Sequence, residues 1–211
     1  MTSDRTRSGR SAQDQDFAES GVTMVELMIT ILVFSIFLAV VLSSLVGITK
    51  ASTQAQTIAR SSTGVLIVFQ NFDRAIRYAD VINAPAAAAG GRYVEFRVPA
   101  KDVASVATCT QWRYVPSTKV IQSRQWPDGA TGSATAWATK LTFVFDDGAN
   151  YPFALIPAGG TGSTMQQLKL TIDAGNASQK GALVTTNFVA RNSSAASNTA
   201  GVICSAGSMR P

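Results

Sequence analysis

The feature that most constrains this chain is a long apolar segment near its N-terminus. No charged residue occurs from Leu27 to Thr49, and 17 of the 22 residues from Leu27 to Ile48 are Ala, Val, Ile, Leu, Met or Phe. A helix of this length extends for about 33 Å and can cross the roughly 30 Å hydrocarbon core of a bilayer. A secretory signal peptide has a shorter apolar core of about 7 to 15 residues. The segment therefore predicts a single membrane-spanning helix over about 22–48.

The composition excludes several kinds of site. The chain has 211 residues, no histidine and two cysteines. Without histidine there is no Ser-His-Asp or Cys-His nucleophile system and no histidine-ligated zinc site. No serine lies in a nucleophile motif, and no pair of carboxylates suggests acid–base catalysis. The sequence thus predicts a protein that is not an enzyme and that holds no metal and no cofactor.

A polar leader of 21 residues precedes the apolar segment and ends in Gly21. The stretch GVTMVELMITILVFSIF at 21–37 then places one carboxylate, Glu26, at the fifth position counted from Val22. An ionisable group at the centre of a membrane helix costs about 2.5 to 3.5 kcal/mol, and less near its end. Glu26 therefore requires a partner of opposite charge.

This arrangement resembles the N-terminal region of type IV pilin precursors, in which a glycine precedes an apolar stretch with glutamate at its fifth position. The resemblance implies cleavage between Gly21 and Val22 by a prepilin peptidase, N-methylation of Val22, and assembly of the apolar helices into a filament core. The family usually has phenylalanine or methionine where this chain has Val22. Cleavage would create an α-ammonium group that is mostly protonated at neutral pH, and Glu26 is its expected partner within or between subunits.

The helix is expected to continue beyond the membrane, because no proline occurs before Pro85. We predict one helix over 22–82, amphipathic over about 49–82, with Gly64 as a point where it can kink. Its apolar stripe recurs at steps of three and four residues: Ala51, Ala55, Ile58, Ser62, Val65, Phe69, Phe72, Ile76 and Ala79.

The remainder of the chain favours β structure. Residues 83–91 form an expected linker, 92–191 an antiparallel β domain and 192–211 a C-terminal tail. Turns are expected at 116–119 and at Asp147-Gly148. The expected strands are 92–98, 109–115, 119–126, 140–145, 151–156, 167–172 and 183–190. The predicted fold class is α+β and pilin-like, a long helix packed on an antiparallel sheet.

The two cysteines, Cys109 and Cys204, both follow the membrane segment. In the pilin orientation they face an oxidising exterior, where disulfides persist. Cys204 lies in a tail of small polar residues that burial cannot hold. We expect a Cys109–Cys204 disulfide that pins this tail to the sheet, with two separate buried thiols as the alternative.

Two loops carry weaker candidate sites. Asp146, Asp147 and Asn150 are oxygen donors, and some pseudopilins bind calcium in such a loop, but their spacing favours a plain hairpin turn. The glycines of the second loop lack the lysine and the following helix of a phosphate-binding loop: Gly159, Gly160 and Gly162.

Positive charge suggests a nucleic-acid surface. Removal of the leader leaves 15 basic and 9 acidic residues. One cluster could combine stacking with phosphate contacts: Trp112, Arg113, Tyr114, Arg124 and Trp126. Strand alternation instead places Trp112 and Tyr114 in the core, and the basic residues are scattered, so DNA is the weaker candidate partner.

These observations together suggest a structural minor pilin or pseudopilin subunit of a type IV pilus, a competence pseudopilus or a type II secretion pseudopilus. NFDRAIRYA at 71–79 and TTNFVARN at 185–192 loosely resemble minor subunits of the J type. The expected partners are prepilin peptidase, other pilin subunits and the cytoplasmic membrane. The chain would span that membrane once with its β domain outside and then enter an extracellular or periplasmic filament. The alternative is a membrane-anchored extracellular binding module for adhesion or DNA capture.

Overall fold

The structure is a computed structural model that describes residues 21–103, 105–130, 134–146, 148, 151–159, 162–177, 179–201, 203–204 and 210. The chain divides into two compact units, Met1–Thr49 and Lys50–Pro211. One helix, α1 (Met24–Ile76), has 53 residues. Within the first unit its apolar side chains are exposed on every face. Among the described residues, α1 is the one helix that is long and apolar enough to cross a membrane.

The second unit contains two antiparallel sheets, which gives the α+β fold class expected from the sequence. Sheet A has the order β1-β3-β4-β5-β6, with β2 beside β3, and sheet B has the order β10-β9-β7, with β8 beside β9. The strands are β1 Val81–Ile82, β2 Ala86–Ala88, β3 Gly91–Val98, β4 Thr108–Val115, β5 Val120–Pro127, β6 Ala138–Leu141, β7 Val144–Phe145, β8 Phe153–Ile156, β9 Gln167–Gly175 and β10 Lys180–Val189. A short 3₁₀ helix, η2 (Ala195–Thr199), follows.

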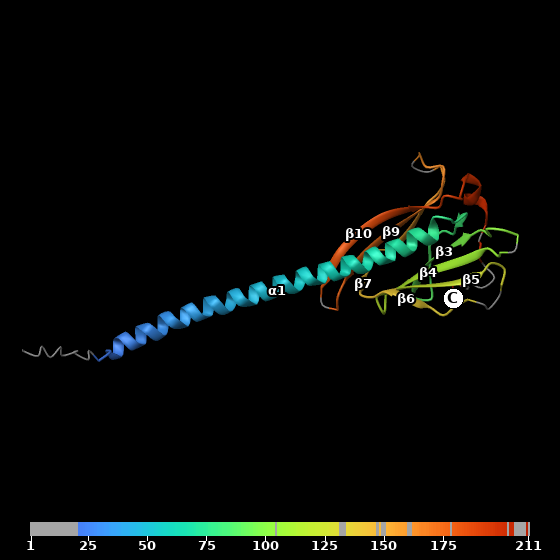
Figure 1. Ribbon diagram of the computed structural model, residues 1–211. Helices are drawn as coiled ribbons and strands as arrows, with labels where there is room; N and C mark the ends of the chain where they lie inside the picture. Colours follow the sequence, from blue (N-terminus) through green and yellow to red (C-terminus); the bar gives the residue numbers. More distant parts are fainter. Residues whose placement is uncertain are drawn as a thin grey trace, which may run out of the picture. The chain divides into compact units, whose positions relative to one another are not determined.

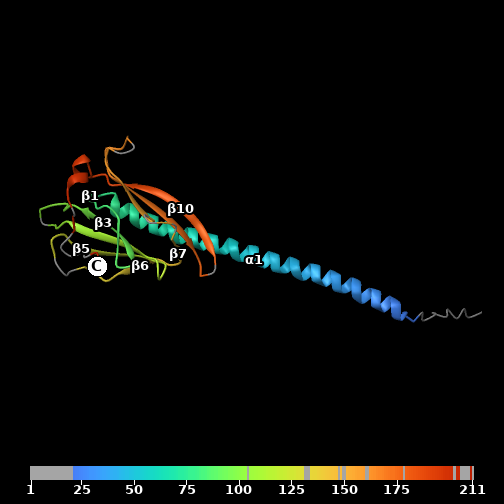
Figure 2. The same cartoon turned by 180° about the vertical axis from the view of Figure 1, so that it is seen from behind.

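The part of α1 that belongs to this unit packs between the two sheets. Figures 1 and 2 show β9 and β10 on one side of this part of α1, and β5 and β6 on the other. Phe72 is fully buried at the centre, with its ring centroid 4.3 Å from that of Trp112 in sheet A and 5.5 Å from that of Phe188 in sheet B. The Tyr114 hydroxyl donates a hydrogen bond to the Val144 carbonyl at 3.0 Å and joins the sheets directly.

The predicted apolar stripe is correct only from Val65 onward. Ala51 and Ala55 are exposed, Ile58 is 40% exposed, and Thr57 and Ser61 are the buried residues instead. The reason is the β9–β10 hairpin, from which Asn176 Nδ2 donates to Thr57 Oγ1 at 2.9 Å. A polar contact therefore replaces the expected apolar one at this end of the helix. At Gly64, where the helix is continuous, a Cβ would lie 3.0 Å from Leu141, so glycine allows β6 to approach closely.

The predicted helix over 22–82 and linker over 83–91 were wrong at their boundaries. The helix ends at Ile76, because the chain turns and Val81–Ile82 pairs with β3. The linker region contains β2, which forms a hairpin with β3. Absence of proline permits a helix there, but burial of Val81 and Ile82 in sheet A determines the strand.

The predicted strand over 140–145 is two strands in different sheets. β6 ends at Leu141 in sheet A, and β7 begins at Val144 in sheet B. Phe143 has a φ of 57° between them, a left-handed conformation that breaks the ladder. The expected turn at 116–119 is present. Asp147 lies outside the described residues, and the two strands that flank Gly148, β7 and β8, both pair with β9 and not with each other.

Candidate functional site

The start of α1 contains the residues that the sequence singled out for processing. Gly21 and Val22 precede the helix, and Thr23 caps it. The Glu26 backbone N–H donates to Thr23 Oγ1 at 3.2 Å, and the Leu27 N–H donates to the Thr23 carbonyl at 3.1 Å. Glu26 is thus the third residue of the helix, where a carboxylate is favoured by the helix dipole. Sequence reasoning missed this cap, although the T-x-x-E spacing at 23–26 is its usual signal.

Gly21 lies in open surroundings ahead of the helix. A Cβ at this position would meet no atom within 4 Å of it.

The hydroxyl groups within the apolar part of α1 are satisfied by the helix itself. Thr30 donates to the Glu26 carbonyl at 2.7 Å, and Ser35 donates to the Ile31 carbonyl at 2.7 Å. Such internal bonds are required where a bilayer offers no polar partners. Glu26 is then the one ionisable side chain from Val22 to Thr49.

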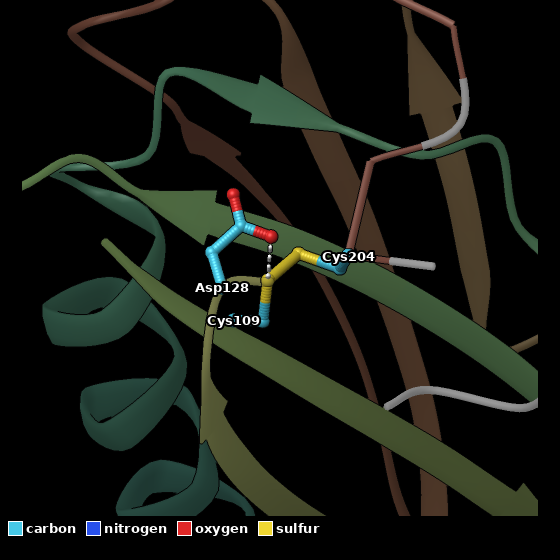
Figure 3. Close-up of side chains that lie close together, drawn as sticks. All are labelled: Cys109, Asp128 and Cys204. Atoms are coloured by element: carbon cyan, nitrogen blue, oxygen red, sulfur yellow. Dashed lines mark hydrogen bonds between the residues drawn. A yellow bond between two sulfur atoms is a disulfide. The ribbon is translucent and has the colours of Figure 1, made fainter. Parts of the chain in front are cut away.

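The expected disulfide between Cys109 and Cys204 is confirmed. Cys109 lies on β4, and the bond connects it to a tail residue 95 positions further along the chain (Figure 3). Both cysteines are buried, together with Trp126 and Ile203. The expectation that burial cannot hold the tail was wrong, because Ile203 and Ser193 are also buried.

A carboxylate lies beside the disulfide. Asp128 Oδ1 is 3.5 Å from Cys109 Sγ, along the dashed line of Figure 3, but a disulfide sulfur has no proton to donate, so this is a contact only. Asp128 and Asp80 instead share Arg97, whose Nη atoms lie 3.4 and 2.8 Å from them. The hydrogen bond to Asp80 raises the pKa of Arg97 despite its partial burial. Because the sulfurs are bonded to each other, these residues do not form a thiolate metal site.

A second anchor of the tail was missed by sequence reasoning. Arg210 Nε donates to both carboxylate oxygens of Glu95, at 2.9 and 3.1 Å. The Glu95 side chain is 1% exposed and also accepts from Gln111 Nε2 at 2.7 Å and Asn83 Nδ2 at 3.3 Å. The alternation of RYVEFRV predicts that Glu95 faces away from the helix, but it does not predict that this face is buried. Glu95 is buried because the tail covers the face of β3 opposite to the helix.

The weaker candidates do not come together as sites within the described part of the chain. Asp146 forms an ion pair with Arg92 and accepts the Gly148 N–H at 3.2 Å, while Asp147 and Asn150 lie outside the described residues. Gly159 and Gly162 have positive φ values in a surface turn, and Gly160 also lies outside the described residues.

The five residues considered for DNA binding do not form one exposed surface. Trp112, Tyr114 and Trp126 are buried. Arg113 and Arg124 lie on the opposite face of the sheet from Trp112, against the Trp137 ring, with guanidinium carbons 3.9 and 4.4 Å from its centroid. Burial, and then the neighbouring Arg113, lower the pKa of Arg124. The core positions that strand alternation indicated for Trp112 and Tyr114 are therefore confirmed, and the stacking surface considered as the alternative is not present among the described residues.

Comparisons with protein-family models, with curated proteins and with solved structures found no match for this chain.

Proposed function

We propose that this chain is the precursor of a type IV pilin-like subunit, of the minor pilin or pseudopilin kind. In this proposal a prepilin peptidase cleaves between Gly21 and Val22, Val22 is N-methylated, and α1 joins the apolar core of a filament. The chain serves a pilus, a competence pseudopilus or a secretion pseudopilus, first anchored in the cytoplasmic membrane with its β domain outside. The role is structural, and no catalytic step is assigned to it.

The observation that carries the proposal is the order of Gly21, Val22 and Glu26 at the start of a long, exposed apolar helix. The surroundings of Gly21 are open, and a peptidase that binds an extended backbone at the scissile bond would favour glycine there. The exposed apolar part of α1 that follows provides a surface for packing against other helices in a filament.

Glu26 supports the proposal in a second way. The cap uses the Glu26 backbone N–H and needs no charge on the side chain, and the helix dipole favours a carboxylate there by only about 0.3 to 1 kcal/mol. In an apolar bundle a carboxylate needs a nearby cation as well, and cleavage would supply the α-ammonium group of Val22.

Two variants separate these roles of Glu26. Glu26→Gln keeps the cap and removes the charge, whereas Thr23→Ala removes the cap at a cost of about 1 kcal/mol and keeps the charge. We expect Glu26→Gln to lower the amount of subunit in sheared filaments by roughly tenfold or more, since an unpaired charge in an apolar bundle costs several kcal/mol. Thr23→Ala should leave that amount within about twofold of the wild type. Equal incorporation of both variants would contradict the charge pairing.

Processing is tested at Gly21. Gly21→Val should accumulate the uncleaved precursor, visible as a slower band in immunoblots of cells that contain a prepilin peptidase. If Gly21→Val is processed normally, the cleavage site lies elsewhere. If neither protein is processed, the membrane-anchored binding module becomes the better interpretation.

A further inference from the structure

A groove lies between α1 and sheet A, with residues of β4, β5 and β6 along it. Figure 1 shows the course of these strands beside α1. Its volume is about 290 Å³. Asn71, Arg74 and Ala75 line it from one face of the helix, where steps of three and four residues bring side chains together. The sheet contributes two pairs of directly opposite residues, Thr110 with Gln125 and Trp112 with Ser123, and the side chain of Lys140.

Lys140 reaches the groove because β6 is irregular. The register passes from Ile121↔Leu141 to Gln122↔Thr139, so Lys140 is the extra residue of a β-bulge. Leu141 lies against α1 at Gly64, and Lys140 lies on the same side. Bulges of this kind redirect a side chain that a regular strand would point elsewhere.

Three groups that line the groove suit an anion: the Trp112 indole N–H and the side chains of Arg74 and Lys140. Trp112 is 2% exposed, and its indole Nε1–H is buried without an acceptor among the described residues. A buried donor without an acceptor is unfavourable by about 1 to 3 kcal/mol. Arg74 and Lys140 form no ion pair with any described residue, and no carboxylate lines the groove.

We propose that this groove binds a carboxylate side chain presented by an acidic segment of a partner protein. Two cations and a buried N–H donor match an anionic acceptor, and a carboxylate side chain is the anionic acceptor that a protein surface offers. The open side of the groove, at exposed Lys140 on the edge strand, gives access to a protein surface.

The partner is a different protein rather than a second copy of this chain. From Lys50 onward, the described carboxylates other than Asp102 are all in ion pairs: Asp73, Asp80, Glu95, Asp128, Asp146 and Asp173. Asp102 has contacts of its own. The described part of the domain therefore offers excess positive charge and few free acids to another copy of itself.

The test observes Trp112 directly in the full chain, solubilised in an uncharged detergent. With ¹⁵N-labelled tryptophan, the three indole groups give separate NMR signals, and Trp112→Phe assigns one of them. Acetyl-tetraglutamate amide is titrated as the probe, with acetyl-tetraglutamine amide and inorganic phosphate as comparisons. We expect a saturable downfield shift of the Trp112 indole proton with tetraglutamate and none with tetraglutamine.

Charge variants supply the matched controls. Arg74→Gln and Lys140→Gln should each weaken tetraglutamate binding by about twofold to fivefold, the range for partly exposed ion pairs. Arg60→Gln, on the same helix, and Lys169→Gln, exposed on β9, should leave it unchanged. The proposal is overturned if the Trp112 signal does not move, if the control variants weaken binding equally, or if phosphate binds more tightly than the peptide. It does not depend on the proposed function, because an uncleaved N-terminus would leave these results unchanged.

Discussion

Removal of Arg210 should reveal how strongly the C-terminal tail stabilises the domain. Among the described residues, Arg210→Ala leaves the buried Glu95 carboxylate with Gln111 and Asn83 as hydrogen-bond donors. Loss of one partner of a buried ion pair costs about 3 to 5 kcal/mol. Because the Arg210 side chain is 26% exposed and two amides stay in place, we expect a loss of about 2 to 3 kcal/mol in the free energy of unfolding.

A double-mutant cycle isolates the ion pair from other effects. Glu95→Gln removes the charge while it keeps the shape of the side chain. In combination with Arg210→Ala it should cost less than the two single changes added together, by about 1.5 kcal/mol, since no unpaired charge is then buried. Arg191→Ala is the matched control, because Arg191 is exposed and its side chain has no ion-pair partner among the described residues.

The assay is urea unfolding of the detergent-solubilised chain, followed by tryptophan fluorescence and analysed by linear extrapolation. Arg191→Ala should change the unfolding free energy by no more than about 0.5 kcal/mol. If Arg210→Ala behaves like this control, the ion pair does not stabilise the tail and the reasoning is wrong. Additive effects in the cycle would show that Arg210 acts without Glu95.

Three further predictions concern the second unit. Replacing Cys109 and Cys204 together by serine should lower stability by about 3 to 5 kcal/mol, because the disulfide closes a loop with a sequence separation of 95, and the shift of the urea midpoint measures this. Phe72→Ala should lower the free energy of unfolding by about 3 to 5 kcal/mol in the same assay. Ile67→Ala is the control, because this side chain is 53% exposed, and it should lower the free energy of unfolding by less than about 0.5 kcal/mol. Similar losses for both variants would place Phe72 outside the core. Burial, and then Asp146, raise the pKa of Tyr114 to about 12 from its ordinary value of 10.0. The unfolded state therefore loses this proton first, and the free energy of unfolding should fall as the pH rises between the two values. Tyr114→Phe should lack this part of the fall, and identical alkaline stability profiles of the two proteins would contradict the prediction.

Local patterns in the sequence predicted the features that depend on few other residues. The apolar run specifies a membrane-length helix by itself, and strand alternation placed Trp112 and Tyr114 in the core, as found. The Cys109–Cys204 bond was predicted from the expected exterior location and a count of two cysteines.

Features that depend on distant segments could not be predicted in this way. Thr57 is buried because Asn176, more than a hundred residues later, bonds to it. Phe143 separates two strands that look continuous in sequence, because each strand pairs in a different sheet. The Glu95–Arg210 pair likewise forms only after the tail has folded back over sheet A. In each case a long-range contact overrides the local preference.

The N-terminus of the processed protein tests the central claim most directly. The full chain is produced in cells that contain a prepilin peptidase, and the purified protein is examined by intact-mass and N-terminal peptide mass spectrometry. The account predicts a chain that begins at Val22, with one methyl group on its α-amino nitrogen, and lacks residues 1–21. A chain that retains this leader, or that begins at another residue, would contradict it.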